Sequence, residues 1–322
     1  MLQQGVIVEE FSFNKILNNK YDIFHLHWVV ETIVRHPNPL IVWIRVISML
    51  LLIDWAKARG TRIIWTIHDE NPHSILHVQI ADWFQKEFFK RIDGYISLST
   101  KGKNVAEQIL PSLINKSSSI VYHGHYRDFY PNQINQNQAR EILGISKNIQ
   151  VMLFFGYIDI YKNIPHLIKI FRELSPDNWL LVIAGKIEHS LLKKEILSAS
   201  ENDCRIKLFL NYIPDAQVQF YFKAAELVVL PFKEILNSGS ALLALSFDCP
   251  ILVPSLGSMP ELQSQIGEDW IKLYPGELTT KTLSEGLTWS LQKRQKQNPP
   301  LNQLDWHILS QKTLDFYRLI KR

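Results

Sequence analysis

Cysteine is scarce in this chain of 322 residues, with Cys204 and Cys249 as its two representatives. They lie far apart, and neither belongs to a CxxC motif or to another metal-binding spacing. A disulfide framework is therefore not expected, and the cysteine content indicates a reducing compartment. The first residues, MLQQGVIVEEF, lack the basic start and long apolar core of a signal peptide, so nothing indicates export.

Motifs that would assign several other functions are also missing. The net charge of +4 is mild, and Lys and Arg are scattered without an arginine-rich arm or zinc-finger spacing, so no nucleic-acid partner is expected. The absence of GxGxxG after a first strand argues against a dinucleotide-dependent oxidoreductase, and we expect no cofactor. HExxH, a carboxylate–histidine triad and a convincing Asp-x-Asp are absent too, which predicts no metal site.

Long hydrophobic runs are limited to one segment, Leu40 to Ala56. Arg45 and Asp54 interrupt it, and it falls short of the roughly 20 apolar residues that cross a bilayer. We interpret it as a buried helix. Because Arg45 stands among Trp and Leu residues, an interfacial membrane helix remains the alternative.

The chain does contain a regular alternation of short apolar runs and helical patterns. Runs buried on both faces are typical of strands in parallel sheets, which are joined by right-handed helical crossovers. The strand candidates are GVIVEEF, DIFHLHW, RIIWTIHD, GYISLS, SIVYHG, VMLFFGY, WLLVIAG, IKLFLNY, LVVLPF and PILVPS. The helix candidates are His73 to Arg91, Lys103 to Leu110, Asn163 to Leu174, Leu191 to Ser200 and Ala216 to Ala224. The predicted class is α/β.

The length favours two domains. We place the first over residues 1–135 and the second over residues 136–305, because PNQINQNQ marks the boundary, and a closing helix over residues 306–322 returns to the first. Both domains are expected to be Rossmann-like and doubly wound, facing each other across a cleft. Ligands bind such sheets at the carboxyl ends of the strands.

That rule selects the polar residues that follow each predicted strand. In the second domain they are Gly156, Tyr157, Lys162, Gly185, Lys186, Asn211, Tyr212 and Glu234. In the first domain they are His25, His27, His68, Asp69, Glu70, Ser97 to Lys101, His123 and His125.

The segment from Pro231 to Glu261 carries the most specific signal. It predicts an apolar strand, an Asn-Ser-Gly-Ser loop, an Ala- and Leu-rich helix, a second strand and a Gly-Ser-Met-Pro-Glu turn. A loop of small residues before a helix N-terminus presents free backbone N–H groups and a positive dipole end, which suit a phosphate. The segment therefore indicates a nucleotide-sugar site.

The order FFGYIDIYKNIPHLIKIF, LLVIAGK and AELVVLPFKEILNSGSALLALSFDCPILVPSLGSMPEL resembles the donor-binding domain of GT-B glycosyltransferases of group 1, the family-four type. The resemblance covers Val151 to about Leu262, and DWHILSQKTLDFYRLIKR is similar to the closing helix of such enzymes. It implies that the nucleotide lies against Gly156 and that Lys162 is a point charge on the diphosphate. It further implies that Glu234 touches the donor sugar, that Ser238, Gly239 and Ser240 bind the diphosphate, and that Glu261 lies near the donor.

Three departures from this family pattern stand out. Tyr157 occupies the position of an arginine that usually follows the glycine. The second carboxylate of the Glu-x7-Glu element falls on Leu242 or Leu243, so the ribose contact is absent or moved. Only MLQQ precedes GVIVEEF, so the first strand–helix unit of the family is missing or the start is misassigned.

In the first domain, RIIWTIHDENPHS resembles the strand whose terminal histidine faces the donor sugar. His68 is thus the leading catalytic candidate, with Asp69 as the nearest carboxylate. His27, His123 and His125 are acceptor-side candidates, and a structural role competes with a functional one for each of them. Lys162 could equally be a surface lysine, and Glu234 could cap the helix that follows.

We therefore expect a cytoplasmic, metal-independent hexosyltransferase that uses a nucleoside diphosphate sugar and a glycan or lipid-linked acceptor. A peripheral contact with the inner face of the membrane is left open. The alternative is a non-catalytic nucleotide-sugar-binding or assembly subunit, favoured by the short N-terminus and the lost carboxylate.

Overall fold

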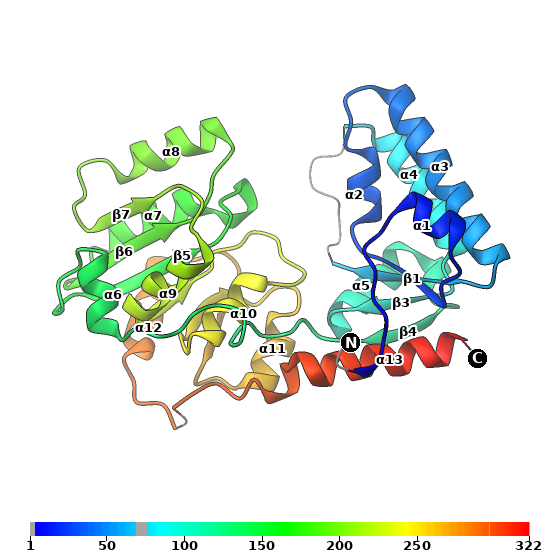
Figure 1. The fold of residues 1–322 in the computed structure, drawn as a ribbon. Helices are drawn as coiled ribbons and strands as arrows, with labels where there is room; N and C mark the ends of the chain where they lie inside the picture. The colour runs from blue at the N-terminus through cyan, green and yellow to red at the C-terminus, as the bar shows by residue number, and fades with distance from the viewer. Residues whose placement is uncertain (1–3, 69–75, 296, 322) are drawn as a thin grey trace. The chain divides into compact units, whose positions relative to one another are not determined.

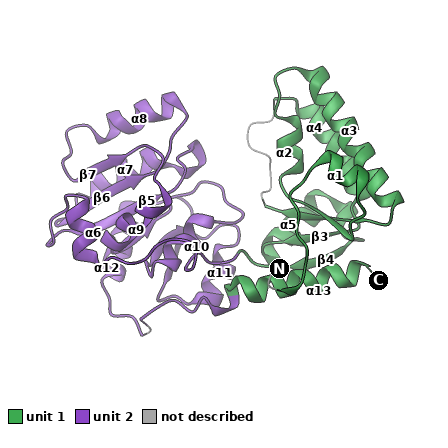
Figure 2. Ribbon diagram, viewed as in Figure 1, with its two compact units in different colours: residues 1–123, 304–322 green, residues 124–303 purple. Residues whose placement is uncertain are grey.

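The computed structural model describes residues 4–68, 76–295 and 297–321, which fold into two compact units (Figures 1 and 2). Unit 1 comprises Met1–His123 and Leu304–Arg322, and unit 2 comprises Gly124–Gln303. The first boundary thus lies at His123 rather than at residue 135, where the sequence placed it, and the second lies at Gln303 rather than at 305. The chain passes from one unit to the other twice.

Unit 1 contains a parallel sheet whose strands follow sequence order. Its strands are β1 (Ile23–Leu26), β2 (Arg62–Ile67), β3 (Gly94–Ser97) and β4 (Ser117–Ile120). Its helices are α1 (Phe13–Asn18), α2 (Val29–Val34), α3 (Pro39–Ala58), α4 (Val78–Arg91), α5 (Thr100–Ile109), the 3-10 turn η2 (Pro111–Leu113) and α13 (Trp306–Lys321). Parallel strands need such crossovers because a short turn cannot join them.

One face of this sheet is covered by the closing helix α13. Ile64 and Ile96 project from that face and pack with Leu309 and Phe316 of α13. Gly94 lies on the same face, and a Cβ there would lie 2.9 Å from the Phe316 ring. The absent side chain lets α13 approach the sheet closely, so the C-terminal helix is part of the core of unit 1.

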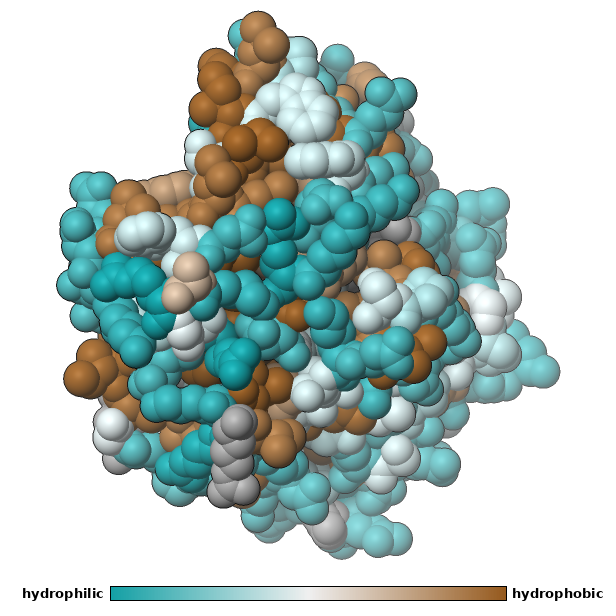
Figure 3. Space-filling model, turned by 90° about the vertical axis from the view of Figure 1, so that its right-hand side faces the viewer, coloured by the Kyte–Doolittle hydropathy of each residue, from teal (hydrophilic) through white to brown (hydrophobic). Residues whose placement is uncertain are grey.

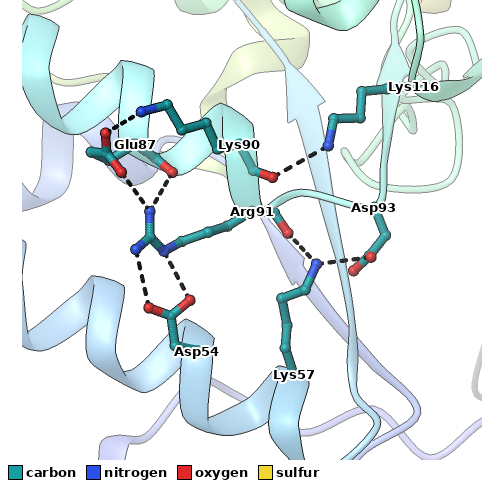
Figure 4. Close-up of polar contacts among 7 residues, drawn as sticks. All are labelled: Asp54, Lys57, Glu87, Lys90, Arg91, Asp93 and Lys116. Atoms are coloured by element: carbon teal, nitrogen blue, oxygen red, sulfur yellow. Dashed lines mark hydrogen bonds and ion pairs between the residues drawn. The ribbon is translucent and has the colours of Figure 1, made fainter.

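A polar network joins α3, α4 and the start of β3 (Figure 4). The Arg91 guanidinium binds both oxygens of Asp54, with its Nε 2.8 Å from Oδ1, and also binds Glu87. Lys57 donates to Asp93 at 2.8 Å. The carboxylate of Asp93 accepts in turn from the backbone N–H of Ile63. These contacts fix the C-terminal halves of α3 and α4 against the sheet.

Unit 2 contains a six-stranded parallel sheet in the order β10-β9-β8-β5-β6-β7. The strands are β5 (Gln150–Phe155), β6 (Trp179–Ala184), β7 (Ile206–Phe209), β8 (Leu227–Val229), β9 (Ile251–Pro254) and β10 (Ile271–Tyr274). The order reverses between β5 and β8, so this is a doubly wound sheet. Residues Val151 to Phe154 are fully buried, as expected of a strand covered on both faces.

The helices of unit 2 cover both faces of that sheet. They are η3 (Ile160–Lys162), α6 (Gln136–Ile142), α7 (Ile164–Leu174), α8 (Ser190–Ser200), α9 (Asp215–Ala224), α10 (Gly239–Ser246), α11 (Met259–Ile266), α12 (Thr280–Ser290) and η4 (Asn302–Leu304), whose last residue belongs to unit 1. Helix α7 packs with α8 and α12, and α6 packs with α9.

Three local predictions and one omission need correction. GVIVEEF forms no strand: it is extended chain in which Ile7 is 89% exposed. β10 was not predicted at all. The helix predicted as buried over Leu40 to Ala56 is α3, and only one side of it is buried. The helix predicted from His73 begins at Val78 among the described residues.

Candidate functional site

The reversal of strand order in unit 2 defines where a ligand can enter its sheet. β5 and β8 are neighbours, and their crossovers run to opposite sides. The loops after two such strands diverge and leave a crevice at their carboxyl ends. Gly156 follows β5 at this point, and the loop that leads to α10 follows β8.

Two glycines are pressed together at this edge. Gly156 and Gly185 follow the paired ends of β5 and β6 and have φ values of 137° and 152°, which only glycine adopts without strain. A Cβ on Gly185 would lie 1.8 Å from the carbonyl oxygen of Gly156. A Cβ on Gly156 would lie 2.8 Å from Oγ of Ser240. The structure therefore brings Gly156, Gly185 and Ser240 together.

The N-terminus of α10 is organised as the sequence suggests. Ser238 is the N-cap, and its Oγ accepts a hydrogen bond from the backbone N–H of Ala241 at 3.1 Å. Gly239 lies against Tyr126, whose hydroxyl would be 3.2 Å from a Cβ at that position. The start of the helix thus offers backbone N–H groups and a positive dipole end beside Gly156.

Lys162 is a buried lysine, not a surface one, with 9% of its area exposed. Its Nζ lies 4.0 Å from the ring centre of Phe232 and 4.7 Å from that of Tyr161. The backbone N–H of Lys233 donates to the carbonyl of Tyr161, which ties η3 to the segment after β8. Aromatic faces stabilise a cation at such distances. Neither ring was predicted from the sequence as part of the site, although Tyr161 precedes Lys162 and Phe232 follows Pro231.

The remaining donor-side candidates lie toward the surface. Tyr157 donates from its hydroxyl to Glu188 at 3.2 Å, and Glu188 also pairs with Lys186 at 2.5 Å. This carboxylate raises the pKa of Lys186, which is held in an exposed ion pair. Tyr212 is exposed in the loop after β7.

The two acidic candidates follow β8 and β9. Glu234 is exposed, and Glu261 is half-buried in the first turn of α11. The loops that carry them are in contact, since a Cβ on Gly257 would lie 2.1 Å from the carbonyl of Ile235. The backbone N–H of Ser258 donates to Leu236 across the same contact. Gly257, at φ 53°, was not singled out from the sequence.

The positions expected for a second carboxylate hold buried leucines. Leu242 and Leu243 lie on α10 with 5% and 9% of their areas exposed. Both are part of the core of unit 2, so they are fixed there by packing.

Unit 1 gathers histidines at the carboxyl edge of its own sheet. His27 follows β1 and His68 follows β2, and Nδ1 of His27 lies 2.8 Å from Nε2 of His68. One ring must donate the proton of this hydrogen bond and the other accept it. His25 lies two residues before His27, within β1. Its Nε2 is 2.6 Å from Oγ1 of Thr66, and its Nδ1 is 2.5 Å from the hydroxyl of Tyr317.

These rings are held neutral. The pKa of His68 is lowered to about 4, chiefly by burial and also by the neighbouring His27 and His123. Burial also lowers the pKa of His27, and it lowers that of His25 to about 3. A neutral imidazole at pH 7 can accept a proton, which an imidazolium cannot.

The other candidates from the first domain, and one further aromatic residue, lie in different places. Trp28, which the sequence did not single out, stacks on His68 with ring centres 4.0 Å apart and is half exposed. His123 lies against Trp306 of α13, with ring centres 5.9 Å apart. His125 was expected on the acceptor side, but it belongs to unit 2, is buried and accepts from the backbone N–H of Arg127. Asp69 lies outside the described residues.

No group of three or more His, Cys, Asp or Glu in the described part of the chain is arranged to hold a metal ion. His27 and His68 hydrogen-bond to each other, and His25 bonds to the hydroxyl groups of Thr66 and Tyr317.

Comparison with known proteins extends this picture. Residues 135–265 match the family model for glycosyl transferases group 1. A GDP-mannose:glycolipid 4-beta-D-mannosyltransferase from Xanthomonas campestris pv. campestris is 29% identical over 301 residues, which cover 94% of this chain and 80% of that protein.

Solved structures share the fold at low sequence identity. Sucrose-phosphate synthase from Thermosynechococcus elongatus has a TM-score of 0.68 at 13% identity, covering 93% of this chain and 74% of that one. Anabaena HepE in complex with UDP-glucose has a TM-score of 0.60 at 15% identity, with coverages of 86% and 74%. The predicted α/β class with two parallel sheets is confirmed, and so is the family resemblance.

Proposed function

We propose that this chain, whose residues 135–265 match the group 1 glycosyltransferase family and whose fold is shared with GT-B enzymes, moves a hexose from a nucleoside diphosphate sugar to a hydroxyl of a glycolipid or polysaccharide. The relative named above uses GDP-mannose and a glycolipid, and Anabaena HepE binds UDP-glucose. GDP-mannose is therefore our first donor candidate. If the acceptor is a glycolipid, the protein would act in the cytoplasm at the inner face of the membrane.

The observation that carries this proposal is the cradle at the carboxyl edge of β5 and β6. Gly156 and Gly185 allow the backbone after β5 to lie against the backbone after β6, and Ser240 in the first turn of α10 lies beside Gly156, so the N–H groups of this helix N-terminus are at the same edge. Lys162 supplies a positive charge from the next loop. In this assignment Ser238, Gly239, Ser240 and Lys162 bind the diphosphate and stabilise its charge as it leaves.

The remaining roles complete the donor site. Glu234 and Glu261 would contact the sugar, while Tyr157 would stand where relatives of this family place an arginine. Lys186 and Tyr212 would border the nucleotide. With leucines at 242 and 243, ribose contacts would come from elsewhere in the site.

In unit 1 we assign proton acceptance to His68. If transfer inverts the anomeric centre, a base must take the proton of the acceptor hydroxyl. His68 is neutral at pH 7, and its hydrogen bond to His27 fixes the orientation of the ring. If transfer retains the configuration, the same ring would position and polarise the reactants. Asp69, the next residue in the sequence, stays a catalytic candidate, and His27 and His123 would border the acceptor.

A thermal-shift comparison of UDP, GDP, ADP and their sugars tests donor binding. A ligand that binds only the folded protein raises its apparent stability by mass action. We expect GDP and GDP-mannose to raise the melting temperature most. Failure of all three nucleotides to do so would contradict the donor assignment.

Lys162→Met should weaken donor binding by about 10-fold to 100-fold, the value of one hydrogen bond to a charged group. Lys169→Met on the exposed side of α7 is the matched control and should leave affinity unchanged. Titration calorimetry with GDP measures both. Equal affinity of Lys162→Met and the wild type would remove the phosphate role of this lysine.

We propose that the leaving diphosphate is stabilised by these fixed groups without a metal ion. Transfer should proceed at its full rate in excess EDTA. Loss of activity in EDTA that Mg²⁺ or Mn²⁺ restores would show that a divalent cation is needed.

A further inference from the structure

The outward side of α3 is unusual for a helix on the surface of a protein. Large apolar residues occupy it at helical spacing, and each is between 42% and 70% exposed. These residues, which we call the α3 face, are Leu40, Ile44, Ile47, Leu51 and Trp55. A surface helix normally presents polar residues on its solvent side. The α3 face therefore exposes apolar side chains where a surface helix normally has polar ones.

The opposite side of α3 belongs to the core. Val42, Val46 and Ile53 are fully buried. Among the described residues, α3 is the one helix long and apolar enough to cross a membrane. Crossing would pull these residues out of unit 1 and expose the sheet beneath. The packing favours a helix that stays in place and lies flat on an apolar surface.

Tryptophan lies both within the α3 face, as Trp55, and beside it, as Trp43. Trp43 meets Trp83 of α4 with ring centres 5.0 Å apart, and the Nε1 of Trp55 donates to the carbonyl of Leu17 in α1. Figure 3 shows apolar residues gathered in the upper part of this side of the molecule, over the helices of unit 1, with hydrophilic residues beneath them. Tryptophan is enriched where a protein meets the boundary between lipid and water.

The charged residues near the α3 face indicate which kind of surface it binds. Residues 35–62 carry five basic residues and one acidic residue, Asp54. Lys57 and Arg62 form ion pairs with Asp93, so the positive charge beside the α3 face comes from Arg35, Arg45 and Arg59. Asp54 is neutralised by Arg91 (Figure 4). The guanidinium of Arg59 lies 5.7 Å from the Trp55 ring centre, so a positive charge borders the apolar stripe. Apolar residues flanked by Arg and Trp are the pattern of helices that lie in the interface of anionic membranes.

We infer that the α3 face docks unit 1 onto an anionic lipid bilayer. Its apolar side chains enter the boundary between headgroups and acyl chains, and the arginines contact the phosphates. The inference deepens the proposed function, because a glycolipid acceptor is embedded in such a surface. Its physical basis is the composition of α3 and does not depend on which sugar is transferred.

Vesicle flotation without donor or acceptor tests the inference. The full-length protein should float with vesicles of equal amounts of phosphatidylcholine and phosphatidylglycerol. The double variant Ile44→Ser, Leu51→Ser should bind at least about 10-fold more weakly, since two apolar side chains no longer enter the bilayer. Leu191→Ser, Leu197→Ser on α8 removes equally exposed leucines from unit 2 and should bind like the wild type.

Arg45→Gln separates the charge from the apolar contact. It should weaken binding to the mixed vesicles about 5-fold and leave binding to pure phosphatidylcholine unchanged. The GDP-induced thermal shift should be the same in every variant, which shows that they fold and separates this inference from the donor assignment. Flotation of the double variant equal to that of the wild type, or a wild type that does not float, would overturn the inference. So would concentration-dependent self-association that the double variant abolishes while flotation persists, since the face would then belong to a second copy.

Discussion

His25 shows how a single residue links the fold to pH. It is enclosed between Thr66 and Tyr317, and a neutral imidazole satisfies both hydroxyls by donating to one and accepting from the other. A protonated ring could donate to both hydroxyl oxygens, so it is the burial of its positive charge that disfavours this form. Burial accordingly lowers its pKa to about 3, below the value near 6.5 of an unfolded chain.

The resulting pH dependence has a definite sign. Between pH 6.5 and 3 the unfolded state binds a proton at this residue and the folded state does not, so the free energy of unfolding falls as the pH is lowered. From pH 7 to pH 5 the loss due to His25 should be about 1–2 kcal/mol. Urea unfolding of the wild type and of His25→Gln at the two pH values measures it. An identical loss in both proteins would show that His25 does not contribute.

At the scale of elements, α6 illustrates a helix held by one charged residue. Arg140 is buried, and it donates to Glu226 at 2.6 Å and to the carbonyls of Ala224 and Lys147. Glu226 also accepts from the backbone N–H of Val151 at 2.6 Å. The pair thus joins α6 to the starts of β5 and β8.

Arg140→Met should lower the free energy of unfolding by about 3–5 kcal/mol, because it leaves the Glu226 carboxylate without its buried partner. The matched control is Lys169→Met, which removes a lysine from an exposed pair and should cost less than about 1 kcal/mol. Chemical denaturation checks both. Equal destabilisation by the two variants would show that burial of the pair is unimportant.

The same scale shows what the sequence could and could not predict. β5 and β6 were found because continuous apolar runs identify strands covered on both faces. GVIVEEF also begins with an apolar, β-branched run but forms no strand, because pairing depends on a neighbour that local sequence does not describe. β10 escaped notice because it is a short edge strand interrupted by Lys272.

The candidate site was predictable in its residue types but not in its contacts. Gly156 and Gly185 were selected as residues that follow strands. Their close approach depends on the register that pairs Phe155 with Ala184, which no local pattern encodes. The aromatic rings around Lys162 and the bond between His27 and His68 likewise join distant segments. Predicted strand ends show which residues are candidates for the site. Only the tertiary structure shows which of these residues are in contact.

At the scale of the whole molecule, α13 makes the last residues of the chain necessary to unit 1. Leu309 and Phe316 pack on Ile64, Ile96 and Val121. Removal of residues 306–322 would expose this cluster, and burial of each large apolar side chain contributes about 1.5–3 kcal/mol.

The truncated protein should therefore lose stability in unit 1 alone. Hydrogen exchange followed by mass spectrometry should show at least about 10-fold faster exchange in β2 and β3, with β5 and β6 unchanged. Equal acceleration in both units would contradict the division into separately stabilised cores.

The two passages of the chain between the units also set an order for biosynthesis. Gly124–Gln303 is continuous, whereas unit 1 needs Leu304–Arg322 to complete its core. A ribosome releases the chain from the N-terminus, and domains fold as units while synthesis proceeds. Unit 2 can thus fold while the chain is still growing. The part of unit 1 that precedes unit 2 in the chain must wait for Leu304–Arg322 before its own core can close.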